Sequence, residues 1–126
     1  MTQFIKNSEK FAVWRKGLEL ADTVQKLADK LALPESLDFR GMLKKMTFSI
    51  PSHIAEGLMM KDSDERKNYF YRALSCLEEL LNGLLMTEQK GYLKQVQTRK
   101  LKREIVELNR LICELITPRC LMLNAD

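Results

Sequence analysis

The sequence contains little of what many classes of protein require. Its 126 residues include only 5 glycines and 3 prolines, and 45% of them are hydrophobic. This composition excludes a collagen-like chain and a largely disordered one. No uninterrupted apolar run approaches the roughly 20 residues that span a bilayer, and the first residues lack the apolar core of a secretory signal. We therefore expect one cytoplasmic domain, residues 1–126, with no membrane partner.

Residues that carry enzyme chemistry are also scarce. His53 is the single histidine, and the three cysteines form neither an even disulfide set nor a C-x-x-C metal pair. His53 and Glu56, three residues apart on a helix, would supply half of a metal site with Glu78 or Glu79 of the next helix. Carboxylate-bridged sites in bundles use paired E-x-x-H motifs and more ligands than this. The prediction is a protein without catalytic residues, metal or cofactor, and a metal enzyme is kept as a third reading.

Apolar residues recur at the three- and four-residue spacing of helices in four segments. We expect helices over about 11–32, 37–60, 63–90 and 98–117, with flexible ends. Pro34 interrupts the pattern, Asp62 is placed to cap a helix start, and Gly91 is placed to end one. Asn7 or Ser8 is the expected cap of the first helix. Because short connections make successive helices antiparallel neighbours, the predicted fold is an all-α, up-down-up-down four-helix bundle.

A proline stands in the middle of the second expected helix. In a helix interior it removes one hydrogen bond and clashes with the preceding turn, at roughly 3 kcal/mol or more. The apolar residues nevertheless keep their helical step across Pro51, from Ile50 to Ile54. The sequence therefore predicts one kinked helix and not two helices. Its other side carries a polar stripe of Lys45, Ser49, Ser52 and Glu56.

Two groups of polar and small residues on these helices raise packing questions. We expect His53 to be hydrogen-bonded and Glu56 to pair with a cation, Lys45 or Arg72. On the third helix, one stripe consists of Arg72, Cys76, Glu79 and Gly83. A glycine costs a helix interior roughly 1 kcal/mol relative to alanine, so Gly83 suggests close packing against a neighbouring helix. A tolerated surface glycine is the open alternative. Buried or interfacial thiols are the expected reading of Cys76, Cys113 and Cys120.

The run Ser49-Ile50-Pro51-Ser52-His53-Ile54-Ala55-Glu56-Gly57 resembles the S-I-P-x-N-I-A-E-G signature of a bacterial four-helix-bundle family. That family includes proteins encoded in intervening sequences of 23S rRNA genes. It is related in fold to Avd, the accessory variability protein of diversity-generating retroelements. The segments Phe11-Ala12-Val13-Trp14 and Ala73-Leu74-Ser75-Cys76-Leu77-Glu78-Glu79-Leu80 are similar to further family motifs. The chain departs from the signature at His53, where the family has asparagine.

This resemblance implies an assembly and a set of partners. Avd-like relatives form five-fold barrels that bind nucleic acid and a reverse transcriptase. A homopentamer is therefore expected, with RNA or DNA and a reverse transcriptase as candidate partners. The family signature and its oligomer contacts fall on Lys45, Ser49, Pro51, Ser52, His53, Glu56, Gly57, Cys76, Glu79 and Gly83.

A cluster of cations marks the start of the fourth expected helix. It consists of Lys94, Arg99, Lys100, Lys102 and Arg103. Cations at a helix N-terminus oppose the macrodipole at about 0.3–1 kcal/mol each, so stability alone would favour acidic residues there. In a chain of net charge +4, this placement favours an anionic partner, of which a phosphate backbone is the commonest. A solvated basic turn is the open alternative.

The sequence thus leads to two main functional hypotheses. The first is a non-enzymatic basic homo-oligomer that binds nucleic acid or a nucleic-acid-handling partner. The second is a structural or protein-interaction module whose basic segment is incidental. Affinity for RNA and DNA separates the two hypotheses.

Overall fold

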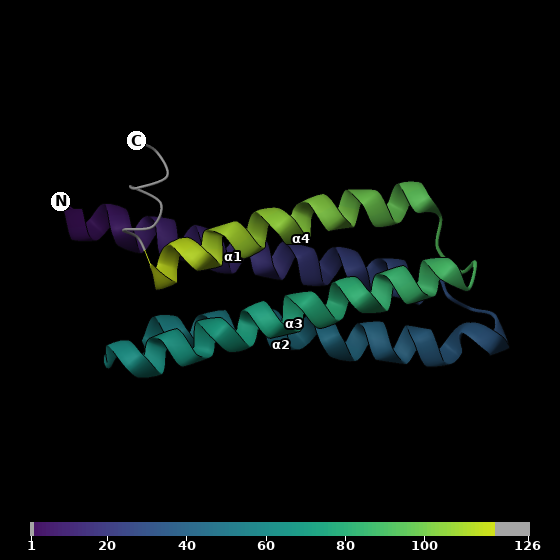
Figure 1. Ribbon diagram of the computed structural model, residues 1–126, viewed down its shortest axis with the longest axis horizontal. Coiled ribbons are helices and arrows are strands. Elements are labelled where there is room, and N and C mark those ends of the chain that lie inside the picture. Colours follow the sequence, from purple (N-terminus) through teal and green to yellow (C-terminus); the bar gives the residue numbers. More distant parts are fainter. Residues whose placement is uncertain (1, 118–126) are drawn as a thin grey trace.

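The described part of the molecule consists of four antiparallel helices. The structure, a computed structural model, describes residues 2–117, with the side chains of residues 10–117. The helices are α1 (Thr2–Asp29), α2 (Leu37–Met59), α3 (Ser63–Gln89) and α4 (Gln95–Ile116), and a short 3-10 turn spans Pro34–Ser36. Each helix runs opposite to the next (Figure 1), and contacts join α1 to α2, α2 to α3, α3 to α4 and α4 back to α1. The predicted all-α four-helix bundle is confirmed.

Two predicted helix starts were wrong. α1 begins at Thr2 and not near residue 11, so Asn7 and Ser8 lie inside the helix and do not cap it. Neither proline nor glycine stands in residues 2–16 to stop the helix, and each added residue gains a backbone hydrogen bond. α4 begins at Gln95 and not near residue 98, because the Gln97 side-chain carbonyl accepts from the Lys94 backbone N–H at 2.9 Å. α1 also ends three residues earlier than predicted, at Asp29 instead of residue 32.

The two predicted boundaries of α3 are confirmed with their hydrogen bonds. Asp62 caps the start, since its Oδ2 accepts from the Glu65 backbone N–H at 3.0 Å. Gly91 follows the end with a φ of +84°, a left-handed conformation that favours glycine. The Gly91 N–H donates to the Glu88 carbonyl at 2.8 Å, and the next N–H donates to the Thr87 carbonyl at 3.1 Å.

α2 continues through Pro51 without a chain reversal, as the apolar pattern predicted. The proline is buried against α1, where Gly17 lets the two helices approach closely. A Cβ atom on Gly17 would lie 3.6 Å from the Pro51 Cα and 3.1 Å from the Ile54 Cδ1. We infer that this close packing offsets the cost of the missing hydrogen bond.

Two further glycines receive side chains of neighbouring helices. The ring of Phe70, only 1% exposed, packs on the backbone of Gly57, where a Cβ atom would lie 2.5 Å from its Cε1. Gly83 of α3 is buried against Met46 of α2, whose sulfur would lie 3.1 Å from an added Cβ. Gly83 therefore serves helix packing within the chain, which decides between the two readings of this glycine.

The core consists of the apolar stripes that the spacing indicated. Leu43, Ile50 and Ile54 of α2 are fully buried, and the heptad of α4 supplies Leu101, Ile105, Leu108 and Ile112. The pattern gave no sign of three buried threonines, Thr47, Thr87 and Thr98. Each hydroxyl donates to a backbone carbonyl of its own helix or of the residue that caps it, so no polar group is left unpaired there. Among the described residues, no helix is both long and apolar enough to cross a membrane.

Candidate nucleic-acid interface

The five predicted cations are all exposed, at the start of α4 or one position before it. Lys94 occupies the N-cap position, and the other four follow within the first three turns. The first turn contains no acidic residue. Between residues 10 and 117, none of the five side chains has a carboxylate within 4.0 Å. These charges are therefore not neutralised by the protein itself.

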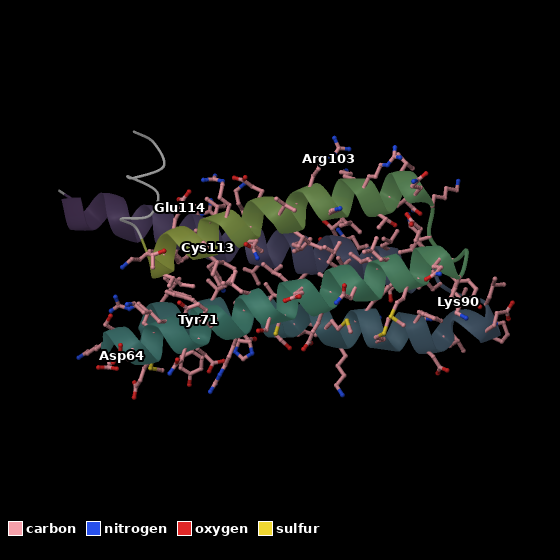
Figure 2. The ribbon with its side chains drawn as sticks, viewed as in Figure 1. Asp64, Tyr71, Lys90, Arg103, Cys113 and Glu114 are labelled. Carbon is pink, nitrogen blue, oxygen red and sulfur yellow. The ribbon has the colours of Figure 1, made fainter. Side chains whose placement is uncertain are left out.

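The helix brings three of these cations together and separates the other two. Arg99, Lys102 and Arg103 line a shallow depression of about 570 Å³ on the outer surface of α4. We call these three residues the α4 basic face. Figure 2 shows Arg103 extending away from the other helices. Lys94 and Lys100 do not line this depression.

The α4 basic face contains one apolar residue that the sequence pattern did not single out. Val106, 56% exposed, lies in the same depression. It directly follows Ile105, a heptad core position, so it cannot itself belong to the core stripe. An apolar residue at an exposed heptad position was the signal available in the sequence.

Further along α4, the next arginine is already paired. Arg110 donates from Nη2 to the Glu107 Oε1 at 2.7 Å and also contacts the Glu114 carboxylate. The hydrogen bond from Arg110 is the main cause that holds the pKa of Glu107 below its usual value. Because a paired cation adds little to the surrounding field, the basic face ends at Arg103.

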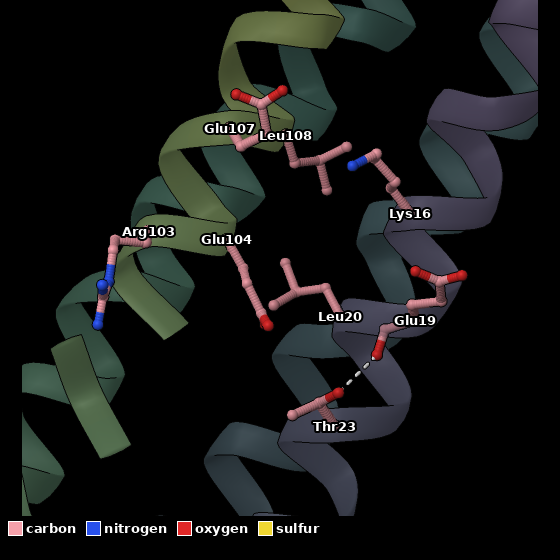
Figure 3. A pocket seen from close by; sticks show the side chains of 8 residues that line it. All are labelled: Lys16, Glu19, Leu20, Thr23, Arg103, Glu104, Glu107 and Leu108. Carbon is pink, nitrogen blue, oxygen red and sulfur yellow. Dashed lines mark hydrogen bonds between the residues drawn. The ribbon is translucent and has the colours of Figure 1, made fainter. Parts of the chain in front are cut away.

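On the α1 side, a groove of mixed charge borders the basic face. It measures about 360 Å³ and has Leu20 and Leu108 among its lining residues. Figure 3 shows Lys16 and Glu104 extending into the space between α1 and α4. The groove is also lined by Glu19 and Glu107, with Arg103 at its edge. Glu107 also lines the depression on α4, but there its carboxylate is paired with Arg110. Glu19 and Glu104 of the groove have no ion-pair partner among the described residues and repel phosphate, so a polyanion is expected on the outer surface of α4 and not in this groove.

The signature residues of α2 lie elsewhere, and two predictions about them were wrong. His53 Nδ1 is buried without a hydrogen-bond partner, and its nearest carboxylate oxygen, Oε1 of Glu56, lies 3.8 Å away. No ion pair joins Glu56 to Lys45 or Arg72 within the described part of the chain. Arg72 instead lies over the Tyr69 ring at 5.0 Å, which accounts for its position.

The remaining predicted contacts divide between the bundle interior and its surface. Cys76 is half-buried on α3, and burial is the main cause that raises the pKa of its thiol, followed by the charge of Glu79. Lys45, Ser52 and Glu79 are exposed, whereas Ser49 is half-buried. Cys113 is exposed, and Cys120 lies outside the described residues. Within that described part, no three His, Cys, Asp or Glu side chains are grouped so as to hold a metal ion.

These features define a small antiparallel four-helix bundle whose last helix presents unpaired cations. The chain matches the model of the 23S rRNA-intervening sequence protein family over residues 9–114 and belongs to that family. The resemblance seen in the sequence is confirmed for the family, and the relation to Avd stays a prediction.

A solved structure shares the fold. It is a crystal structure of a protein of unknown function from the S23 ribosomal protein family of Bacteroides thetaiotaomicron. The two chains are 21% identical, the match covers 86% of this chain and 97% of that one, and the TM-score is 0.77. A comparison with curated proteins finds no match.

Proposed function

We propose that this protein is a non-enzymatic basic homo-oligomer that binds RNA or DNA through the α4 basic face. The observation that carries the proposal is the absence of any carboxylate within 4.0 Å of Arg99, Lys102 or Arg103 among the described residues. Because α4 begins at Gln95, these cations lie in its second and third turns, beyond the first turn in which the helix dipole acts. Their like charges repel one another, and an anionic ligand on this face would relieve that repulsion.

The spacing of the three residues fits contacts to a phosphate backbone. Lys102 and Arg103 follow Arg99 by three and four residues, so the Cβ atom of each lies about 5–6 Å from that of Arg99 on the helix surface. Such contacts position a nucleic acid but do not read its bases. Binding should therefore depend strongly on salt and little on sequence.

Self-association would multiply this charge. Several large apolar side chains on the outer surfaces of α1 and α2 are exposed, among them Phe11, Leu18, Phe48 and Met59. Phe48 is 63% and Met59 is 80% exposed, which supports contacts with further copies of the chain. In a pentamer, which the family resemblance implies, five copies of +4 give about +20, a strong field for polyanions. Light scattering at micromolar concentration tests this assembly, and a monomer mass would reject it.

The same exposed apolar side chains favour a second candidate function. A partner protein that covers Phe48 and Met59 would make the chain a structural or protein-interaction module. A reverse transcriptase is such a partner and would bring its own nucleic acid. Under this alternative the isolated protein binds neither RNA nor DNA.

The deciding experiment compares two variants of equal charge. In the first, Arg99, Lys102 and Arg103 are all changed to glutamine. The control carries the same change at three exposed cations outside α4 that are in no ion pair among the described residues, namely Arg15, Lys30 and Lys61. Fluorescence anisotropy with labelled RNA and DNA of several sequences should show a large loss for the first variant only. Equal binding by both variants would refute the assignment of the face, and no binding by the parent at low salt would favour the alternative.

A further inference from the structure

A second groove lies between α3 and α4. Its volume is about 390 Å³, and its apolar lining includes Leu74, Leu81 and Ile105. Two of its lining side chains are large and apolar yet more than half exposed: Tyr71 is 53% and Val106 is 56% exposed. We call this feature the α3/α4 groove. Its lining also contains the polar side chains of Ser75 and Glu78.

On α4 the groove reaches from Ile105 to Asn109, and the helix ends about two turns further on, at Ile116. Tyr71 of α3 lies at the same end of the bundle as Cys113 and Glu114 of α4 (Figure 2). The Cys113 thiol lies on the groove side of α4, since its sulfur is 3.7 Å from the Oδ1 of Asn109, a lining residue. The helix ends at Ile116, and the backbone of Thr117 has left the helical conformation, with a φ of −136°.

The chain continues from this point with an apolar segment. After Thr117 the sequence reads Pro118-Arg119-Cys120-Leu121-Met122-Leu123, and a proline disfavours the helical conformation in the residue before it. We propose that the segment 119–123 folds back along α4 and docks into the α3/α4 groove of its own chain. The proposal does not depend on nucleic-acid binding.

The length of the segment fits the groove. An extended residue spans about 3.3 Å and a helical residue 1.5 Å, so each returning residue passes about two residues of α4. Counted back from Pro118, residue 120 comes level with about residue 113 or 114. Leu121 and Leu123 then fall between about residues 107 and 112, within the stretch that carries Asn109 and ends near Val106. The apolar side chains therefore reach the exposed apolar lining.

This geometry also gives a chemical test. It places Cys120 beside Cys113, on the groove side of α4. Glu114 is the next residue along the chain and lies about 100° further around the helix, where it pairs with Arg110. A tail that moves freely reaches both positions equally, whereas a docked tail reaches position 113 preferentially.

The experiment uses two full-length proteins that each keep one cysteine pair, with Cys76 changed to serine in both. The first protein retains Cys113 and Cys120, and the second carries Cys113→Ser and Glu114→Cys. Diamide removes one hydrogen from each of two thiols and is itself reduced, which leaves a disulfide. Trypsin cleaves after Arg110 and Arg119, so a linked pair of peptides identifies the bond by mass. In each protein, the rate of disulfide formation is divided by the rate at which iodoacetamide alkylates the thiol at position 113 or 114. This removes the effect of any difference in reactivity between these two thiols.

We expect the disulfide to form about tenfold faster with Cys113 than with the cysteine at position 114. Leu121→Asp with Leu123→Asp should reduce this ratio to about one. Val106→Asp should do the same from the groove side, and this exposed position leaves the core unchanged, as circular dichroism can verify. Equal rates in the parent proteins, a ratio that survives these changes, or disulfides formed mainly between chains would each overturn the proposal.

Discussion

Two glycines of α2 should respond differently to alanine, which tests the packing of Phe70 on Gly57. At Gly57, an added Cβ would lie 2.5 Å from the Phe70 Cε1 and 2.8 Å from its Cδ1. A contact this short forces the ring or the backbone to shift. Because the ring is only 1% exposed, it has little free space to move into. At Gly41, no atom lies within 4 Å of the added Cβ.

The magnitude follows from two opposing effects. Alanine in place of glycine stabilises a helix interior by about 1 kcal/mol at either position. At Gly57, overpacking of the core adds a penalty of about 1–3 kcal/mol. Gly41→Ala should therefore raise the free energy of unfolding by about 1 kcal/mol. The free energy of unfolding of Gly57→Ala should be about 1–3 kcal/mol lower than that of Gly41→Ala. The difference between the two variants isolates the overpacking effect because the propensity gain cancels.

Urea unfolding followed by circular dichroism measures both values. The protein concentration must be the same throughout, since association adds to apparent stability. Phe70→Leu in the Gly57→Ala background should recover part of the loss, because a smaller side chain relieves the contact. Equal stabilisation by both alanines would refute the close packing of Phe70 on Gly57.

Three further predictions concern single side chains. Lys44 holds the pKa of Asp29 below its ordinary value of 3.8, chiefly by a hydrogen bond. The free energy of unfolding of the parent should therefore exceed that of Asp29→Asn at neutral pH, and this difference should shrink as the pH falls below 3.8 and through the lowered pKa of Asp29. A constant difference down to pH 2 would contradict this. Cys76 should react with iodoacetamide more slowly than Cys113, because burial disfavours its thiolate; equal rates would speak against the packing of α3 on α2. Gly83→Ala should change stability by less than about 1 kcal/mol, since its neighbour Met46 is flexible, and a loss like that of Gly57→Ala would be inconsistent with this account.

Periodicity and boundary residues allowed most of the fold to be predicted. The apolar step across Pro51 requires one helix, and Asp62 and Gly91 carry their structural roles in their own chemistry. The start of α1 could not be placed, because residues 2–10 lack both an apolar stripe of their own and a residue that stops a helix. Spacing on a helix also shows which residues share a face, but not what the face meets. For that reason the partner of Gly83 could be found only in the structure.

Part of the candidate site could likewise be predicted from the sequence, and part could be found only in the structure. Five clustered cations could be recognised in the sequence, where the helix was expected to begin near residue 98. Because α4 begins at Gln95, four of them lie beyond the first turn in which the helix dipole acts. Their separation into Arg99, Lys102 and Arg103 on one side and Lys100 on another depends on where α4 begins and how it is rotated against the bundle. The environment of Glu56 was missed because the cation expected to pair with it, Arg72, lies over an aromatic ring instead.

The salt dependence of binding tests the central claim most directly. Affinity for one labelled DNA duplex is measured at increasing salt for the parent, for the variant with glutamine at Arg99, Lys102 and Arg103, and for the control of equal charge. Each phosphate neutralised on duplex DNA adds about 0.9 to the slope of log affinity against log salt. The basic-face variant should therefore lose about 2–3 from its slope, and the control should keep the slope of the parent. A basic-face variant with the slope of the parent would contradict the proposed interface.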